Sequence, residues 1–316
     1  MVVRIGTWNL ENLFRPGADG GPRTEDAYQA KLSSLADTIT VLAPDVLAVQ
    51  EVGDPDALTD LADRAGGGWH LATADPDRRG IRVGFLSRLE LTDIEQTIGF
   101  PAGLRPIQVD DTNTTSSTMG RPALRARVQA GSQSIDLVTC HLKSKLLTFP
   151  GGRFSPRDEG ERARFGAYAL NRRTAEAVTV RAAATALLDG QGQQRAVVVL
   201  GDLNDEPAAA TTQILHGPPG SEIGTAGFTR PDQGDGVRLW NLAAQIPEAQ
   251  RFSRVYRGRG ELIDHILVSH ALVGLIPNGA VTTDTTAAAP SITDDPRTRR
   301  DAPGSDHRPV LATINL

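Results

Sequence analysis

The chain has 316 residues and a formal net charge of −5, with 39% hydrophobic and 22% charged residues. These values are ordinary for a globular protein, and no apolar run approaches the roughly 20 residues that span a bilayer, which excludes a membrane-spanning protein. The acidic balance argues against a protein that holds nucleic acid by its overall charge. The single cysteine, Cys140, excludes an intramolecular disulfide, and its apolar surroundings predict a buried thiol.

Apolar runs and turn signals predict strands and helices that alternate through the first half of the chain. A strand over 3–10 precedes a helix over 24–42 and a second strand that ends at Gln50-Glu51. A short helix over 56–64 comes next. Three strands follow, which we predict to form an antiparallel meander, at 69–73, 81–87 and 92–98.

The second half is predicted to combine strands, among them 196–200 and 262–268, with one long helix and several loops. The loops have no helical or strand period and cover 101–119, 213–259 and 282–303. Alternation predicts strands over 123–128 and 135–138, and a helix is expected over 159–188. The buried stripe of that helix is predicted to contain Ala175, Val178, Ala182 and Ala186.

Five short polar motifs stand where apolar runs end. In chain order they are Thr7-Trp8-Asn9-Leu10-Glu11, Val49-Gln50-Glu51-Val52, Thr139-Cys140-His141-Leu142, Leu200-Gly201-Asp202-Leu203-Asn204 and Gly304-Ser305-Asp306-His307-Arg308-Pro309. They supply carboxylates, carboxamides and two imidazoles, an oxygen-rich set that suits a hard cation such as Mg²⁺. The sequence therefore predicts a site for phosphate chemistry. Because that site needs both ends of the chain, residues 1–316 are expected to form one domain.

The succession of these motifs, with the strand Ile263-Asp264-His265-Ile266 before the last one, resembles the endonuclease/exonuclease/phosphatase superfamily. This group contains deoxyribonuclease I-like and exonuclease III-like metal-dependent phosphoesterases, and the resemblance runs from Trp8 to Val310. It implies an α/β fold, a four-layer α/β/β/α sandwich of two mixed β-sheets flanked by helices. The strand-rich pattern with few but long helices agrees with that arrangement.

The resemblance also implies a set of metal ligands. Glu51 follows a buried strand, where a carboxylate is costly unless it binds a cation or caps a turn. The resemblance makes Glu51 the principal ligand of Mg²⁺, and Mn²⁺ can take the place of Mg²⁺. The alternative role for Glu51 is a salt bridge within its loop. Asn9 is expected to present its carboxamide oxygen to the same metal, with Glu11 as a supporting residue and Asp306 as a metal-side acid.

The catalytic residues implied by the resemblance come from three motifs and one strand. Asp202 and Asn204 lie two apart, so both side chains emerge on one face of an extended strand. Asp202 is expected to orient and deprotonate the attacking water, while Asn204 holds that water or a phosphate oxygen; an Asx turn is compatible with both roles. Asp264 matches the carboxylate that pairs with His307 and favours its imidazolium form. His141 supplies either a second cation or a hydrogen-bond donor.

Basic residues gather after His141 although the chain is acidic overall. They outnumber acids between residues 143 and 181, and a second group of arginines occupies 251–259. One interpretation is a solvated face. The other is a rim that grips phosphate, in which Lys143, Lys145 and Arg153 bind the substrate.

The function favoured by these observations is Mg²⁺-dependent phosphodiester hydrolysis by a nuclease, most simply an endonuclease. Water activated by Asp202 attacks in line while His307 and His141 stabilise the phosphorane. The alternatives are a phosphoesterase for a small phosphorylated metabolite, nucleotide or lipid head group, and a catalytically silent phosphate-binding module. The expected partner is nucleic acid or another phosphodiester substrate, with no obligate protein partner. The N-terminus enters the first motif strand directly, which predicts a cytoplasmic protein without a signal peptide.

Overall fold

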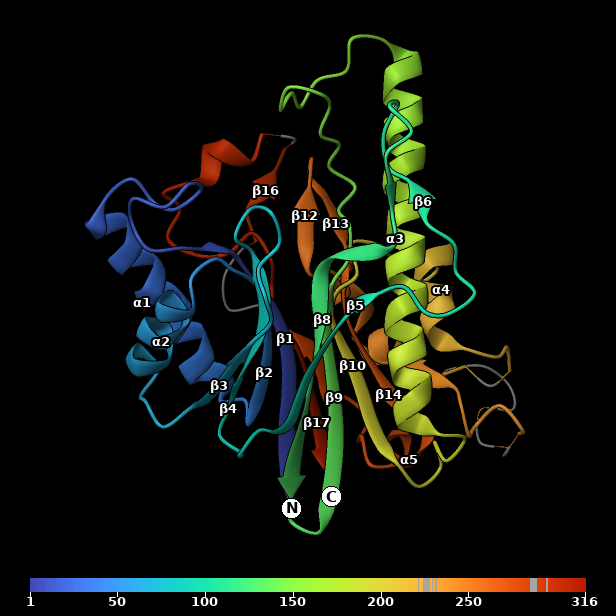
Figure 1. The fold of residues 1–316 in the computed structure, drawn as a ribbon. Coiled ribbons are helices and arrows are strands. Elements are labelled where there is room, and N and C mark those ends of the chain that lie inside the picture. Colours follow the sequence, from blue (N-terminus) through green and yellow to red (C-terminus); the bar gives the residue numbers. More distant parts are fainter. Residues whose placement is uncertain (221, 224–227, 229, 231, 285–288, 294) are drawn as a thin grey trace.

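Two six-stranded sheets pack face to face at the centre of the computed structural model, and helices cover their outer faces (Figure 1). The structure describes every residue except 221, 224–227, 229, 231, 285–288 and 294. The predicted four-layer α/β/β/α sandwich is therefore confirmed.

The first sheet contains both ends of the chain. Its strand order is β15-β17-β1-β2-β4-β3, and the strands are β1 (Val2–Leu13), β2 (Val46–Val52), β3 (His70–Thr73), β4 (Arg82–Ser87), β15 (Val281–Thr283) and β17 (Val310–Asn315). Strand β1 runs parallel to β2 and antiparallel to β17, so the sheet is mixed as predicted.

The second sheet is mixed in the same way. Its order is β11-β14-β10-β9-β8-β5, formed by β5 (Thr92–Gly99), β8 (Thr118–Ala130), β9 (Gln133–His141), β10 (Ala196–Asp202), β11 (Leu239–Asn241) and β14 (Asp264–Ser269). Strands β9 and β10 are parallel, whereas β14 pairs antiparallel with β10.

The predicted meander is wrong in its third strand. Strands β3 and β4 pair antiparallel as expected, but β5 pairs with β8 at the edge of the other sheet. Ion pairs cross this pairing, since Glu95 on β5 lies 3.2 Å from Arg125 on β8, and Asp93 pairs with Arg127. A period-2 pattern identifies a strand without identifying its partner.

Helices close the sandwich on both outer faces. Helices α1 (Glu25–Leu42) and α2 (Pro55–Arg64) share an apolar cluster with the first sheet, and α3 (Glu159–Leu188) and α4 (Ala210–His216) share another with the second. A third cluster fills the layer between the sheets. The short helix α5 (His270–Val273) follows β14. Within the described residues, no helix is long and apolar enough to cross a membrane.

The predicted buried stripe of α3 is mostly wrong. Ala175 is buried, but Val178 and Ala182 are only half-buried and Ala186 is exposed. The face that packs on the second sheet instead carries Ala177, Val180, Ala184, Leu187 and Leu188. Alanines occur on several faces of this helix, so their spacing alone cannot identify the packed one.

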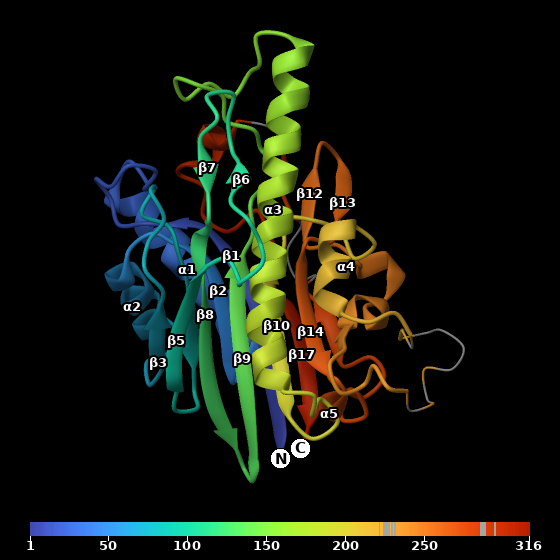
Figure 2. The ribbon, with the colours of Figure 1, turned by 45° about the vertical axis from the view of Figure 1, so that its right-hand side comes forward.

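Short elements interrupt stretches that the sequence predicted to be loops. A small hairpin of β6 (Ile107–Gln108) and β7 (Thr115–Ser116) lies beside the N-terminal part of α3 (Figure 2). Further along are the 3₁₀ helices η1 (Leu242–Gln245), η2 (Glu248–Gln250) and η3 (Pro296–Arg299) and a small sheet of β12 (Arg254–Tyr256), β13 (Arg259–Glu261) and β16 (Ser291–Ile292). The loop predictions for 101–119, 213–259 and 282–303 are therefore wrong at these elements, and part of the last two lies outside the described residues.

Gly201 on β10 allows two strands to approach closely. A Cβ atom at this position would lie 2.0 Å from the carbonyl oxygen of Cys140, and the backbone φ of +148° disfavours other residues.

We expect Gly201→Ala to lower the free energy of unfolding by about 2 kcal/mol or more, measured by urea denaturation. The matched control is Gly99→Ala on β5, where a Cβ meets nothing within 4 Å. Equal unfolding free energies for the two variants would contradict this account.

Candidate active site

Polar side chains replace apolar ones at one end of the layer between the sheets. Alternate residues of each strand point into this layer. On β10, Val198 and Leu200 belong to its apolar cluster, and Asp202 is the next residue in that alternation. The same alternation brings Asn9 into the layer after Ile5 on β1. The two sheets thus turn from apolar to polar at the same end, and this end forms the candidate site.

Asp202 lies at the centre of the site. Its backbone pairs with His141 of β9 on one side and with Asp264 of β14 on the other. From the opposite sheet, Nδ2 of Asn9 donates a hydrogen bond of 3.0 Å to Oδ2 of Asp202. Three strands and both sheets therefore converge on one buried carboxylate.

The structure brings Asp264 and His307 together, as the resemblance implied. Nδ1 of His307 lies 2.7 Å from Oδ2 of Asp264, and both residues are buried. Burial lowers the pKa of His307, but the negative charges of Asp264, Asp306 and Asp202 outweigh this effect and raise the pKa to about 10. His307 is therefore an imidazolium at neutral pH, and its Nε2 lies 4.0 Å from Asp202.

Two contacts hold the segment that carries His307. The indole Nε1 of Trp8 donates to the His307 carbonyl at 2.9 Å. The Ser305 hydroxyl donates to the Asn9 carbonyl at 2.6 Å and accepts the His307 N–H at 3.0 Å. The chain near its C-terminus is thereby fixed to β1, although Trp8 and His307 are 299 positions apart in the sequence.

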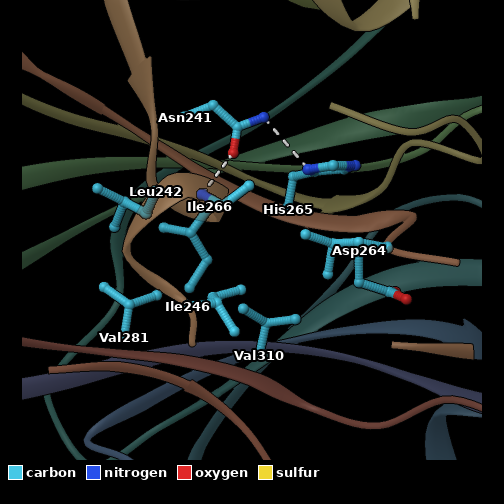
Figure 3. Close-up of a pocket in the computed structure, with 10 residues that line it drawn as sticks. Asn241, Leu242, Ile246, Asp264, His265, Ile266, Val281 and Val310 are labelled. Atoms are coloured by element: carbon cyan, nitrogen blue, oxygen red, sulfur yellow. Dashed lines mark hydrogen bonds between the residues drawn. The ribbon is translucent and has the colours of Figure 1, made fainter. Parts of the chain in front are cut away.

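A narrow apolar pocket lies behind Asp264 (Figure 3). Side chains such as Ile246, Val281 and Val310 line it so closely that it has no room for a water molecule. The Asp264 carboxylate points away from this pocket (Figure 3), and its Oδ2 lies 2.7 Å from Nδ1 of His307. Within the described part of the chain, Oδ1 of Asp264 is buried and has no hydrogen-bond partner. Such dry surroundings strengthen the attraction between Asp264 and His307.

Asp202 is suited to accept a proton near neutral pH. Burial raises its pKa to about 6; the charge of Asp264 adds to this rise and the charge of His307 opposes it. Its Oδ1 accepts the backbone N–H of Asn204 at 2.8 Å, which is the Asx turn considered from the sequence. Nδ2 of Asn204 donates to the Leu142 carbonyl at 3.0 Å, so the Asn204 oxygen is the end of the carboxamide that can face a substrate.

Arg121 on β8, which sequence reasoning missed, determines the state of His141. The Arg121 guanidinium hydrogen-bonds to Nδ1 of His141, while its Nε pairs with Asp77 at 3.3 Å. A guanidinium can only donate, so Nδ1 must accept and the ring proton must be on Nε2, which lies 3.4 Å from Asp202. Burial, with the nearby charges of Arg121 and His307, lowers the pKa of His141 well below its usual value. His141 is therefore a neutral donor and not a second cation.

Glu51, the expected principal metal ligand, is partly exposed beside Asp202. Its Oε2 accepts the Asn12 N–H at 2.9 Å, and its Oε1 lies 3.3 Å from Nδ2 of Asn9. No lysine or arginine among the described residues forms an ion pair with Glu51, which disfavours the salt-bridge alternative. The Asn9 oxygen, expected to face a metal, accepts the Glu11 N–H at 2.9 Å and keeps a second lone pair for a further partner.

Acidic residues surround Glu51 and Asp306. Burial raises the pKa of Glu11 to about 7, two hydrogen bonds from Arg299 (2.6 and 2.7 Å) oppose this rise, and the charge of Asp306 adds to it. Lys31 donates to the Gly304 carbonyl at 3.0 Å. Carboxylates therefore outnumber cations here, and Glu51 with Asp306 fits the oxygen ligands of a hard divalent cation.

The described residues also contain one compact group with metal-ligating atoms, namely Asp202, Asp264 and His307, whose atoms lie within 4.8 Å of one another. In this group the positive charge is already supplied by His307. Because Nδ1 of His307 is bound to Asp264, we interpret the group as an ion pair beside the buried Asp202 carboxylate.

The three basic residues predicted to bind substrate already contact other groups of the same chain. Nζ of Lys143 donates to the carbonyls of Ser144 and Leu146 at 3.1 and 3.0 Å. Lys145 pairs with Asp205 at 3.2 Å, and Arg153 pairs with Glu161 at 2.7 Å. Further arginines of this region pair with acids in the same way, namely Arg162, Arg164, Arg172 and Arg173. The structure thus favours the first interpretation, in which most basic side chains of this loop and helix pair with nearby acids. It disfavours a rim of unpaired cations that binds phosphate.

Solved structures with the same fold have low sequence identity to this chain. TDP2 from Caenorhabditis elegans has a TM-score of 0.60 at 14% identity, over 100% of this chain and 75% of that one. The 3'-5' exonuclease NExo from Neisseria meningitidis has a TM-score of 0.56 at 17% identity, over 99% of this chain and 100% of that one. An AP endonuclease from Archaeoglobus fulgidus has a TM-score of 0.56 at 16% identity, with the same coverage.

No curated protein matches the sequence closely enough to count as a relative. A family model does match, and it covers residues 6–307, from β1 to His307. All five polar motifs begin within this range. The protein therefore belongs to the Endonuclease/Exonuclease/phosphatase family, and is an enzyme that hydrolyses phosphate esters.

Proposed function

We propose that the protein is a Mg²⁺-dependent phosphodiester hydrolase, folded as one domain, in which Asp202 activates the attacking water. The observation that carries this proposal is the buried Asp202 beside the Asp264–His307 ion pair, with Glu51 partly exposed next to them. A near-neutral base and a fixed imidazolium within 4.0 Å of each other are the two groups that hydrolysis in water requires.

Each residue has a separate task in the proposed mechanism. Asp202 holds the attacking water and takes its proton, and Asn204 orients that water or a phosphate oxygen. Nε2–H of His307 and Nε2–H of His141 donate to phosphate oxygens as negative charge develops in the transition state. Asp264 keeps His307 charged and correctly oriented. No covalent enzyme intermediate forms, because the nucleophile is water.

Glu51, Asp306 and Asn9 are the residues that we propose to hold Mg²⁺, with Mn²⁺ as a substitute. When bound, such an ion polarises a phosphate oxygen and neutralises charge on it. The acidic surplus around Glu51 and Asp306 supports this location. A cytoplasmic location stays a prediction from the sequence.

For the substrate, we propose a nucleic acid and therefore a nuclease. Support comes from proteins of the same fold: TDP2 from D. rerio has been solved with a single-stranded DNA product, and NExo from Neisseria with a product DNA hairpin. One observation favours a second candidate, a small phosphorylated metabolite, because Lys143, Lys145 and Arg153 are already paired internally. An enzyme for a small substrate does not need a long cationic surface.

Replacing Glu51 tests the metal site. Glu51→Gln keeps the shape but removes the charge, so we expect Mg²⁺ affinity to fall at least tenfold, on the order of 1.4 kcal/mol, with loss of bis-p-nitrophenyl phosphate hydrolysis. Calorimetric Mg²⁺ titration and EDTA inhibition of the wild type measure both effects. The control is Glu90→Gln, an exposed position. Normal turnover with Mg²⁺ still bound by Glu51→Gln would remove Glu51 from the metal site.

Replacing Asp202 or His307 tests the proposed mechanism. We expect Asp202→Asn and His307→Gln each to lower kcat by about 10²-fold or more with little change in KM, because both groups act mainly in the transition state. Steady-state kinetics with bis-p-nitrophenyl phosphate measure this, and His70→Gln at an exposed position is the control. A change confined to KM would reassign both residues to substrate binding.

Salt dependence separates the two substrate candidates. Nucleic-acid binding weakens with salt by a log–log slope of about −0.7 to −0.9 per phosphate contact, and we expect a total slope of about −2 for a single-stranded DNA oligonucleotide. Because Arg153 is paired with Glu161, Arg153→Gln should leave this slope unchanged. Fluorescence anisotropy under conditions without turnover measures it. If no oligonucleotide binds even in low salt, the small-metabolite candidate replaces the nuclease.

A further inference from the structure

Arg254 stands at the edge of the active site on the short strand β12. Its backbone forms an isolated antiparallel bridge with His307, so the two residues are neighbours across the chain. The guanidinium lies close enough to Asp202 and Asp306 to interact with both charges. Strands β12 and β13 stand beyond the ends of the two large sheets, on the side where the catalytic residues gather (Figure 1).

The guanidinium of Arg254 donates one hydrogen bond and also lies near the Tyr256 ring, with Cζ 5.9 Å from the ring centroid. Its Nη2 donates to Oε2 of Glu261 on β13 at 2.8 Å. Across the residues that the structure describes, Nε is buried and has no hydrogen-bond partner. A guanidinium offers five N–H donors, and leaving a buried donor unused costs about 1–3 kcal/mol. The side chain is 15% exposed, so its outer edge can still be reached by a ligand.

Arg251 and Arg259, two of the three other arginines in 251–259, lie differently. Arg251 donates to the carbonyls of Ile246 and Ala244, at 2.8 and 3.3 Å, and so fixes the preceding loop. Arg259 is exposed on β13. Arg254 is therefore distinguished by its place beside His307, and the other two serve as internal comparisons for it.

We propose that Arg254, oriented by Glu261, binds a second phosphate group of the substrate, next to the phosphate that is hydrolysed. Planar guanidinium donors match phosphate oxygens and discriminate them from neutral groups. Both a neighbouring phosphodiester of a polynucleotide and a terminal phosphomonoester present this chemistry. The proposal rests on the proposed function, since it names a specificity residue for the same site.

Short thymidine substrates test the proposal. One contains a single phosphodiester (dTpdT), a second adds a neighbouring diester (dTpdTpdT), and two others add a terminal phosphate at the 5′ or the 3′ end. We expect wild-type kcat/KM to be at least tenfold higher for a substrate with a second phosphate than for dTpdT. In Arg254→Gln this preference should fall about tenfold, while Arg254→Lys, which keeps the charge but loses the planar donors, should retain only part of it. Arg259→Gln should keep the full preference.

The outcomes are distinguishable. A preference for the neighbouring diester identifies a polynucleotide as the source of the second phosphate. A preference for a terminal phosphate identifies a small substrate. Either preference supports the role of Arg254 if the Arg254→Gln variant loses that preference. If the wild type cleaves dTpdT with Mg²⁺ but has no preference, or Arg254→Gln keeps the preference, the inference fails and the proposed function stands. An equal loss on all substrates indicates a structural role for Arg254 and also overturns it. If the folded wild type hydrolyses neither these substrates nor bis-p-nitrophenyl phosphate, the proposed function itself fails.

Discussion

The hydrogen bond between Asn9 and Asp202 joins the two sheets at the edge where their core ends. A carboxylate at this depth is costly without partners, so the sandwich must pack in one register for Asp202 to be satisfied. Gln50 strengthens the same connection, because its Nε2 donates to Thr139 of the opposite sheet at 3.1 Å. The packing that places β1 next to β10 therefore also brings the residues of the candidate site together.

The buried charges are balanced in pairs, and this pairing determines where each proton resides. Asp264 keeps His307 protonated, whereas Arg121 keeps Nδ1 of His141 free of a proton. The two histidines are therefore not equivalent, although both present Nε2 to Asp202. One supplies a full positive charge and the other a neutral N–H. Burial and the charge of Asp264 raise the pKa of Asp202 to about 6, while the charge of His307 opposes this rise.

Much of the fold and the membership of the site could be predicted from the sequence, because polar residues at strand ends break an otherwise apolar alternation. The strand partner of β5 could not, since a local period does not indicate the contact between Glu95 and Arg125 of β8. Arg121 was missed because it belongs to no motif; the β8–β9 register, in which Leu124 pairs with Thr139, would have indicated its proximity to His141. The pairing of Lys145 and Arg153 with acids could not be predicted, because a list of basic residues does not contain their acidic partners.

The two chain ends lie side by side at the pole of the sandwich opposite to the chemistry (Figure 1). The backbone of Leu316 donates to the Met1 carbonyl at 2.7 Å, closing the β1–β17 pair. From Val2 to Asn9, β1 spans about 23 Å at roughly 3.3 Å per residue. A tag, a linker to a solid support or a fused partner attached at either end would therefore leave substrate access open. Joining the ends directly and opening the chain elsewhere is a geometrically simple route to a circular permutant of this enzyme.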